Sequence, residues 1–137
     1  MKKVKGFSDV DKQAMQQRAM ELAADEKNGE GAVLAAIAKM SGTDKTIATR
    51  LHTLIKEAAP TLTPKTWYGF PAYANKAGKV VCFFQYAGKF KTRYATLGFS
   101  DSANLDDGEM WPVTFALKQL TITEEAKIVA LVKQAIS

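Results

Sequence analysis

The chain has 137 residues, which is enough for one domain with a hydrophobic core. Its apolar fraction of 47% and charged fraction of 24% are ordinary for a globular protein and exclude a disordered one, and no apolar run reaches the roughly 20 residues of a membrane span. The net charge of +5 is modest, and its basic residues are interspersed with acidic ones outside the N-terminus (Lys2, Lys3 and Lys5), which argues against a nucleic-acid partner.

The N-terminal part of the sequence has a helical pattern. Ser8 is a favourable N-cap for a helix that runs to about Ala24, and a polar loop is expected over residues 25–31. A short helix follows, with four apolar residues: Val33, Leu34, Ile37 and Met40. We interpret residues 1–30 as an N-terminal helical extension and residues 31–137 as the domain itself.

The clearest helix is expected after Thr43, which is its natural N-cap. Its apolar residues recur at i, i+4, i+7, i+8 and i+11 and so share one face: Ile47, Leu51, Leu54, Ile55 and Ala58. Pro60 ends the helix, because the residue before a proline is disfavoured in helical conformation. The only histidine, His52, falls at the edge of the apolar face. We interpret it as a boundary residue, because the spacing places no further metal ligand beside it.

Beyond residue 66 the apolar period changes to two, which indicates strands. Residues 79–86 alternate with apolar side chains on both faces and predict a central strand. A turn at 75–78 pairs it with a strand at 71–75, and a turn at 87–89 leads into a third strand at 90–97. The pattern therefore predicts a three-stranded antiparallel meander.

Three further segments complete the predicted domain. Thr66–Phe70 is expected to be a bent segment that enters the meander, because Gly69 and Pro71 flank its end. Residues 113–118 alternate again and predict another strand. The chain closes with a helix that begins near Thr121 or Thr123, and Thr121 and Glu124 have the spacing of a capping box. Helices followed by strands predict an α+β fold, with an antiparallel sheet and helices packed on one of its faces.

Basic and aromatic residues give the first candidate site. Lys89, Lys91 and Arg93 alternate along the predicted strand at 90–97, so they are expected on one face, where Arg93 could hold an anion through two hydrogen bonds. The alternative is a solvated face of an outer strand. The aromatic segment before them is either part of the core or the rim of a pocket, with Trp67 and Gly69 on one face and Tyr68 and Phe70 on the other. The full candidate ligand-binding set is Trp67, Tyr68, Gly69, Pro71, Tyr73, Lys89, Lys91, Arg93 and Trp111.

An acidic segment gives the second candidate. Its carboxylates are hard oxygen ligands of the kind that calcium, magnesium and ferrous iron accept, although the spacing does not match an EF-hand: Asp101, Asp106, Asp107 and Glu109. The alternative is an ordinary polar surface loop.

Cys82 is expected to be a buried core thiol, because it lies between apolar neighbours in the predicted central strand. A single cysteine excludes an internal disulfide and fits a reducing cytoplasm, and the N-terminus has no apolar stretch of the kind that a secretion signal needs. Phosphate-loop, zinc and nucleophile-elbow motifs are missing from the sequence, so no catalytic residues are assigned and an enzyme is the least favoured class.

Several of these segments together resemble the YdhG-like family, domain of unknown function 1801. The resemblance covers about residues 32–136, and its most specific part is a helix ending in EAAP followed by Trp67, Gly69, Pro71 and Tyr73 in the pattern W-x-G-x-P-x-Y. It implies a compact α+β domain arranged somewhat like frataxin, and some members carry an iron-chaperone label.

The sequence thus favours a cytoplasmic, non-enzymatic binding module without a cofactor. Its partner would be a small anionic molecule or a protein, bound at the aromatic and basic residues by a monomer or weak dimer. The alternative is a ferrous iron chaperone that works through the acidic segment.

Overall fold

The structure is a computed structural model that describes residues 29–137. The predicted helix from Ser8 to Ala24 lies outside the described residues. A helix over residues 29–38 comes first, and the later elements are α2 (Gly42–Ala58), β1 (Thr63–Trp67), β2 (Phe70–Ala74), β3 (Val80–Gln85), α3 (Ala87–Phe90), β4 (Ala95–Phe99), β5 (Thr114–Leu117) and α4 (Ile122–Ala135). The predicted boundary between residues 30 and 31 stays a prediction.

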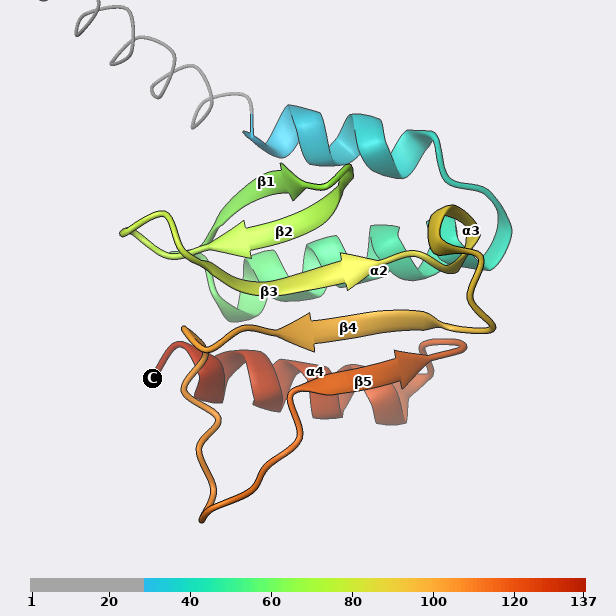
Figure 1. The fold of residues 1–137 in the computed structure, drawn as a ribbon. Helices are drawn as coiled ribbons and strands as arrows, with labels where there is room; N and C mark the ends of the chain where they lie inside the picture. The colour runs from blue at the N-terminus through green and yellow to red at the C-terminus, as the bar shows by residue number, and fades with distance from the viewer. Residues whose placement is uncertain (1–28) are drawn as a thin grey trace, which may run out of the picture.

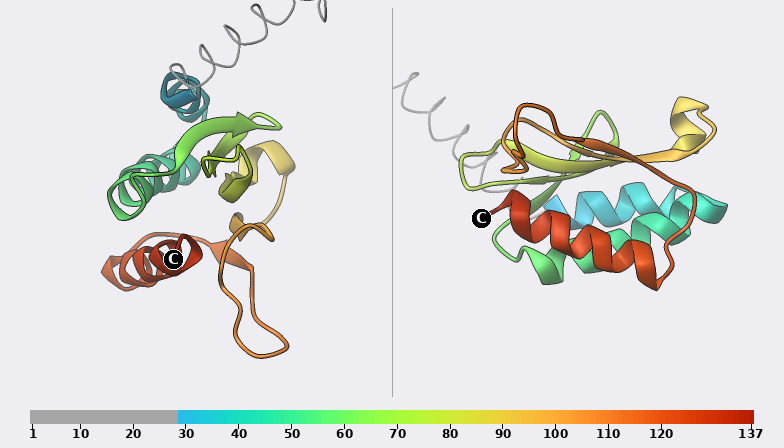
Figure 2. Two further views of the ribbon diagram at one scale, coloured as in Figure 1. Left: turned by 90° about the vertical axis from the view of Figure 1, so that its left-hand side faces the viewer. Right: turned by 90° about the horizontal axis from the view of Figure 1, so that it is seen from below.

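The five strands form one antiparallel sheet in the order β1-β2-β3-β4-β5 (Figure 1). Each strand therefore pairs with its neighbours in the sequence. Figure 2 shows the helix at 29–38, α2 and α4 together on one side of the sheet, while the short α3 lies toward the other side. The predicted α+β fold, with an antiparallel meander and helices on one face, is confirmed.

The core lies between the sheet and the helices. Alternate strand residues point into it and are at most 4% exposed, namely Tyr73, Cys82, Phe84, Leu97 and Phe99. From α2, the predicted apolar face is buried at Ile47, Leu51 and Ile55, and α4 adds Ile128 and Val132. Apolar residues that recur with a period of two in the strands and near 3.6 in the helices thus pack together in one core.

The two long helices have the local signals that the sequence suggested. α2 ends at Ala58, two residues before Pro60, although it begins at Gly42 rather than after the predicted cap Thr43. The backbone N–H of Thr121 donates to the carboxylate of Glu124 at 2.9 Å, which confirms the capping box of α4. A bidentate contact of Arg50 with Glu125, at 2.8 and 3.0 Å, joins α2 to α4.

The loop predicted over residues 25–31 is wrong in its described part, because residues 29–31 already belong to the first helix. Val33, Ile37 and Met40 are buried as the apolar pattern predicts, whereas Leu34 is half exposed. Gly29 and Gly31, which suggested a loop, therefore lie within the first helix.

The segment Thr66–Phe70 is not a bent lead into the sheet, so that prediction is wrong. Trp67 and Phe70 are cross-strand partners, and Tyr68 and Gly69 form a two-residue turn between β1 and β2 with φ values of 51° and 82°. Positive φ at both central positions is typical of the tight turns that match the twist of a β-hairpin. Trp67 and Phe70 therefore lie on the same face, not on opposite faces.

The strand predicted over residues 90–97 is also wrong in its first half. Residues 87–90 form α3, Lys91 follows with φ 53°, and β4 begins only at Ala95. The reason is a contact from a distant element, because the carboxylate of Asp44 on α2 accepts the backbone N–H groups of Ala87 at 3.1 Å and Gly88 at 2.9 Å. This contact favours a helical turn over an extended chain at that point.

Candidate functional site

The face of the sheet that α2 and α4 do not cover carries a second set of aromatic side chains. Phe83 on β3 lies opposite Ala72 on β2 and Gly98 on β4. A Cβ atom at position 98 would lie only 2.2 Å from the ring of Phe83, so the ring rests directly over this glycine. The small neighbour Gly98 therefore leaves room for the Phe83 ring to extend over β4.

Five aromatic residues, which we call the aromatic patch, gather on this side: Trp67, Tyr68, Phe70, Phe83 and Phe90. The ring centroids of Trp67 and Phe83 are 5.3 Å apart, and Phe70 lies 5.7 Å from both Phe83 and Phe90. Phe70 is only 2% exposed because the other four rings surround it. The patch thus has a buried centre and an accessible outer layer.

Tyr68 is the most exposed member of the patch. It is 74% exposed at the tip of the β1–β2 hairpin, and its φ of 51° lies in a region that side chains with a Cβ rarely adopt. Asparagine or glycine would suit this turn position better. A large ring held in the open at the expense of backbone strain is an observation that points to function rather than to packing.

Positive charge accompanies the patch. The sequence from Pro60 to Ser100 contains six lysines and arginines and lacks aspartate and glutamate. Lys65 is exposed on β1, two residues before Trp67 and therefore on the same face. The ammonium group of Lys89 donates to the carbonyl oxygen of Tyr68, next to Gly69, and so lies at the hairpin tip.

The predicted basic stripe is not formed, because its three residues do not share a strand. Lys89 belongs to α3, Lys91 follows it in a left-handed conformation, and Arg93 lies over the ring of Tyr94 at 5.1 Å. Of the three, the structure shows contact with the patch for Lys89, through Tyr68 and through the ring of Phe90 at 5.7 Å.

The predicted aromatic set divides between two environments. Tyr73 is 1% exposed and Pro71 is also buried, so both belong to the interior and not to a pocket rim. Trp67, Tyr68 and Gly69 are at the surface of the hairpin. Trp111 is partly buried against the core on the loop before β5. The aromatic segment is therefore partly core and partly surface, and neither of the two alternatives holds for all of its residues.

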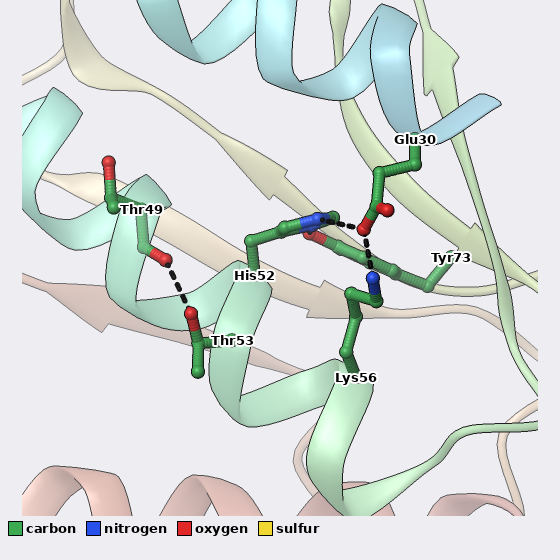
Figure 3. Close-up of polar contacts among 6 residues, drawn as sticks. All are labelled: Glu30, Thr49, His52, Thr53, Lys56 and Tyr73. Atoms are coloured by element: carbon green, nitrogen blue, oxygen red, sulfur yellow. Dashed lines mark hydrogen bonds and ion pairs between the residues drawn. The ribbon is translucent and has the colours of Figure 1, made fainter. Parts of the chain in front are cut away.

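A polar network lies at the junction of the first helix, α2 and β2 (Figure 3). His52 Nδ1 is 2.8 Å from the hydroxyl of Tyr73, and Nε2 is 2.9 Å from a carboxylate oxygen of Glu30. Lys56 donates to the same oxygen. His52 is 6% exposed, so it is a buried residue and the prediction of a boundary position is wrong. Its two ring nitrogens are both occupied.

The partners of His52 define its tautomer. A carboxylate can only accept, so Nε2 must carry a proton and donate to Glu30, and in the neutral ring Nδ1 accepts from the hydroxyl of Tyr73. Hydrogen bonding to Lys56, and next to His52, lowers the pKa of Glu30, and burial raises the pKa of Tyr73. The tyrosine is therefore a stable neutral donor. The network joins the first helix, α2 and β2. Its central pair, His52 and Tyr73, is buried, whereas Glu30 and Lys56 are partly exposed at its edge.

Cys82 is confirmed as a buried core thiol with 0% exposure. Burial raises its pKa to about 12, so the nucleophilic thiolate is scarce at neutral pH. It lies opposite Tyr73 in the sheet, which brings it close to the polar network. Sequence spacing did not reveal this proximity, and the burial of Cys82, Tyr73 and His52 leaves these three side chains without access to a ligand.

The acidic segment forms part of the loop between β4 and β5. Ala103 and Leu105 are buried and anchor it, whereas the four candidate ligands are exposed: Asp101, Asp106, Asp107 and Glu109. Within residues 29–137, His, Cys, Asp and Glu side chains nowhere gather in threes in a way that could hold a metal ion. The iron hypothesis therefore gains no support from the placement of these carboxylates.

Sequence reasoning missed Lys65, Phe83, Phe90 and Asp44. The i, i+2 spacing of Lys65 and Trp67 and the lack of acidic residues between Pro60 and Ser100 could have been noticed. The approach of Phe90 to Phe70 and of Asp44 to α3 could not, because both depend on contacts between distant parts of the chain.

Comparisons with known protein families, curated proteins and solved structures give no match for this chain. The resemblance to the YdhG-like family stays a prediction. None of the helices in the described part of the chain is both long and apolar enough to cross a membrane.

Proposed function

We propose that this protein is a cytoplasmic binding module that holds an anionic ligand on its aromatic patch. The exposed rings of Tyr68, Trp67 and Phe90 would contact the flat or apolar part of the ligand, and Lys65 and Lys89 would contact its negative charge.

The observation that carries this proposal is the strained and exposed Tyr68. A tyrosine at φ 51° costs backbone energy, and at 74% exposure it recovers little of that cost by burial. Its neighbours support a binding role, because the acid-free segment around it favours anions and repels cations. The carboxylate of Asp44 also reaches this region, but its two oxygens accept from Ala87 and Gly88.

The test is a titration of the full chain with a soluble polyanion, inorganic polyphosphate, followed by tryptophan fluorescence and by amide NMR. We expect salt-sensitive binding with shifts at Trp67 and Tyr68, weakened by Lys65→Gln. Lys133→Gln on α4 is the matched control, because it removes an equal charge from an exposed site on a helix of the opposite side. Equal weakening by both substitutions, or shifts confined to other surfaces, would contradict the proposal.

A further inference from the structure

We infer that the ligand of the aromatic patch is single-stranded nucleic acid, with unpaired bases stacked on the exposed rings and phosphates beside the lysines. This inference rests on the proposed function and narrows it to one class of anion.

The first argument comes from the rings. Every base has a flat π-face, and exposed aromatic side chains on an open sheet stack on bases that a duplex would keep paired. Tyr68 stands free at the hairpin tip, Trp67 is partly exposed beside it, and Phe90 is 40% exposed on the neighbouring α3. An acidic peptide would satisfy the lysines but would leave these ring faces without an equivalent partner.

The second argument comes from the distribution of the cations. Lys76 and Lys79 lie in the turn before β3, and Lys89 follows β3 at its other end. A strand of six residues spans about 20 Å. Several linked nucleotides can reach both groups of lysines, whereas one small anion cannot.

The third argument comes from shape. Hollows of 480 and 750 Å³ lie beside α2, the larger one reaching α4, and one of 470 Å³ lies between the β2–β3 turn and the end of α4. All three contain no residue of the aromatic patch. A small ligand gains most from an enclosed pocket. An extended polymer gains instead from repeated contacts along an open surface, which is what this face of the sheet offers.

The dispersed basic residues argued against nucleic acid in the sequence. The fold weakens that argument, because the acid-free segment from Pro60 to Ser100 forms strands β1 to β4 in full and so keeps its basic residues apart from acidic ones. The acidic residues that balance the lysines lie elsewhere in the chain, such as Glu124 and Glu125 on α4.

The experiment measures fluorescence anisotropy of a labelled 12-nucleotide oligothymidine with the full chain at several salt concentrations. We expect binding that Tyr68→Asn weakens by at least about fivefold, the lower end of what one stacked base contributes. Asparagine tolerates positive φ, so this substitution removes the ring without disturbing the turn. Ile122→Asn, at a residue 87% exposed on α4, is the control and should bind like the unmodified protein.

Lys65→Gln should reduce the slope of log affinity against log salt by about 0.7, the value for one phosphate contact on a single strand. A blunt-ended 12-base-pair duplex should bind more weakly than the oligothymidine, because its bases cannot stack on the rings. Binding through the N-terminal lysines alone would be insensitive to Tyr68→Asn.

Three results would overturn the inference. The duplex could bind as well as the single strand, or Tyr68→Asn could leave the affinity for oligothymidine unchanged. In both cases, weaker polyphosphate binding by Lys65→Gln and not by Lys133→Gln would still uphold the anion site itself. A lack of binding to both oligothymidine and polyphosphate would overturn this inference and the proposed function together.

Discussion

Phe83 and Phe84 are neighbours on β3 and point to opposite faces of one sheet. Phe84 is 1% exposed beneath the helices, whereas Phe83 is only half-buried, among the rings of the aromatic patch. The covered face has apolar partners from α2 and α4. The other face has aromatic partners, nearby lysines and a tyrosine in a strained turn. The same residue type therefore serves stability on one face and is available for recognition on the other.

The largest expected effect separates the two faces directly. Phe84→Ala should lower the free energy of unfolding by about 3–5 kcal/mol, because it leaves a cavity in the core. Phe83→Ala should cost about half as much, since less of its area is removed from solvent, and it should weaken polyanion and oligothymidine binding. Urea unfolding and the anisotropy titration measure the two quantities. Equal destabilisation by both substitutions would show that the patch is a second core.

A smaller loss of stability is expected when the buried polar contact between Tyr73 and His52 is removed. Tyr73→Phe removes the hydroxyl that meets His52 Nδ1 and leaves this buried nitrogen without its partner, at a cost of about 1–3 kcal/mol. Ligand binding should be unchanged, because Tyr73 faces the helices. Tyr94→Phe, at an exposed tyrosine, is the control. If it lowers the free energy of unfolding as much as Tyr73→Phe does, the buried hydroxyl contributes nothing beyond an exposed one.

The smallest effect concerns pH. Contact with Arg50 lowers the pKa of Glu125 relative to its ordinary value, and the contact with Thr121 does the same for Glu124. A lowered pKa in the folded state stabilises the protein above the pKa of the unfolded chain, and this contribution is lost as pH falls through the folded value.

The urea midpoint should therefore decrease below about pH 4.5, the ordinary value of a glutamate. Glu125→Gln should make that decrease shallower, whereas Asp107→Asn in the exposed loop should not. A decrease unaffected by Glu125→Gln would remove the Arg50 contact from the explanation. The strands contain no aspartate or glutamate, so this acid sensitivity belongs to the helical side.

Much of the fold follows from local signals in the sequence. The spacing of apolar residues predicted α2, β5 and α4, and the turn before β3 predicted that β2 pairs with β3. Pro60 and the Thr121–Glu124 pair correctly marked the end of α2 and the start of α4. Two of the errors lie where a residue other than glycine adopts positive φ, at Tyr68 and at Lys91. Such residues carry no turn signal, so Thr66–Phe70 was interpreted as a bent segment entering the sheet and residues 90–97 as one strand.

The site was less predictable than the fold. Trp67, Tyr68 and Lys89 lie at the surface, and their role as ligand-binding residues stays a prediction. Tyr73 was placed with them although its hydroxyl is buried against His52. His52 contacts Tyr73, which is 21 residues later in the sequence, and Glu30, which is 22 residues earlier. Neither sequence separation corresponds to the repeat of a helix or a strand. Contacts of this kind depend on tertiary packing, which one sequence does not display.

The strand order also has a consequence for how the chain folds. Because every strand pairs with the next one along the sequence, the sheet needs only short loops to close, apart from the longer connection before β5. Folding rates rise as contacting residues lie closer in the chain, so hairpins can form in succession, as early as during synthesis. We expect the docking of α4 on α2 to be the late step, because it joins Arg50 and Glu125, which are 75 residues apart in the sequence. Until α4 arrives, part of the core face remains open to water, and in that interval the chain is most exposed to aggregation.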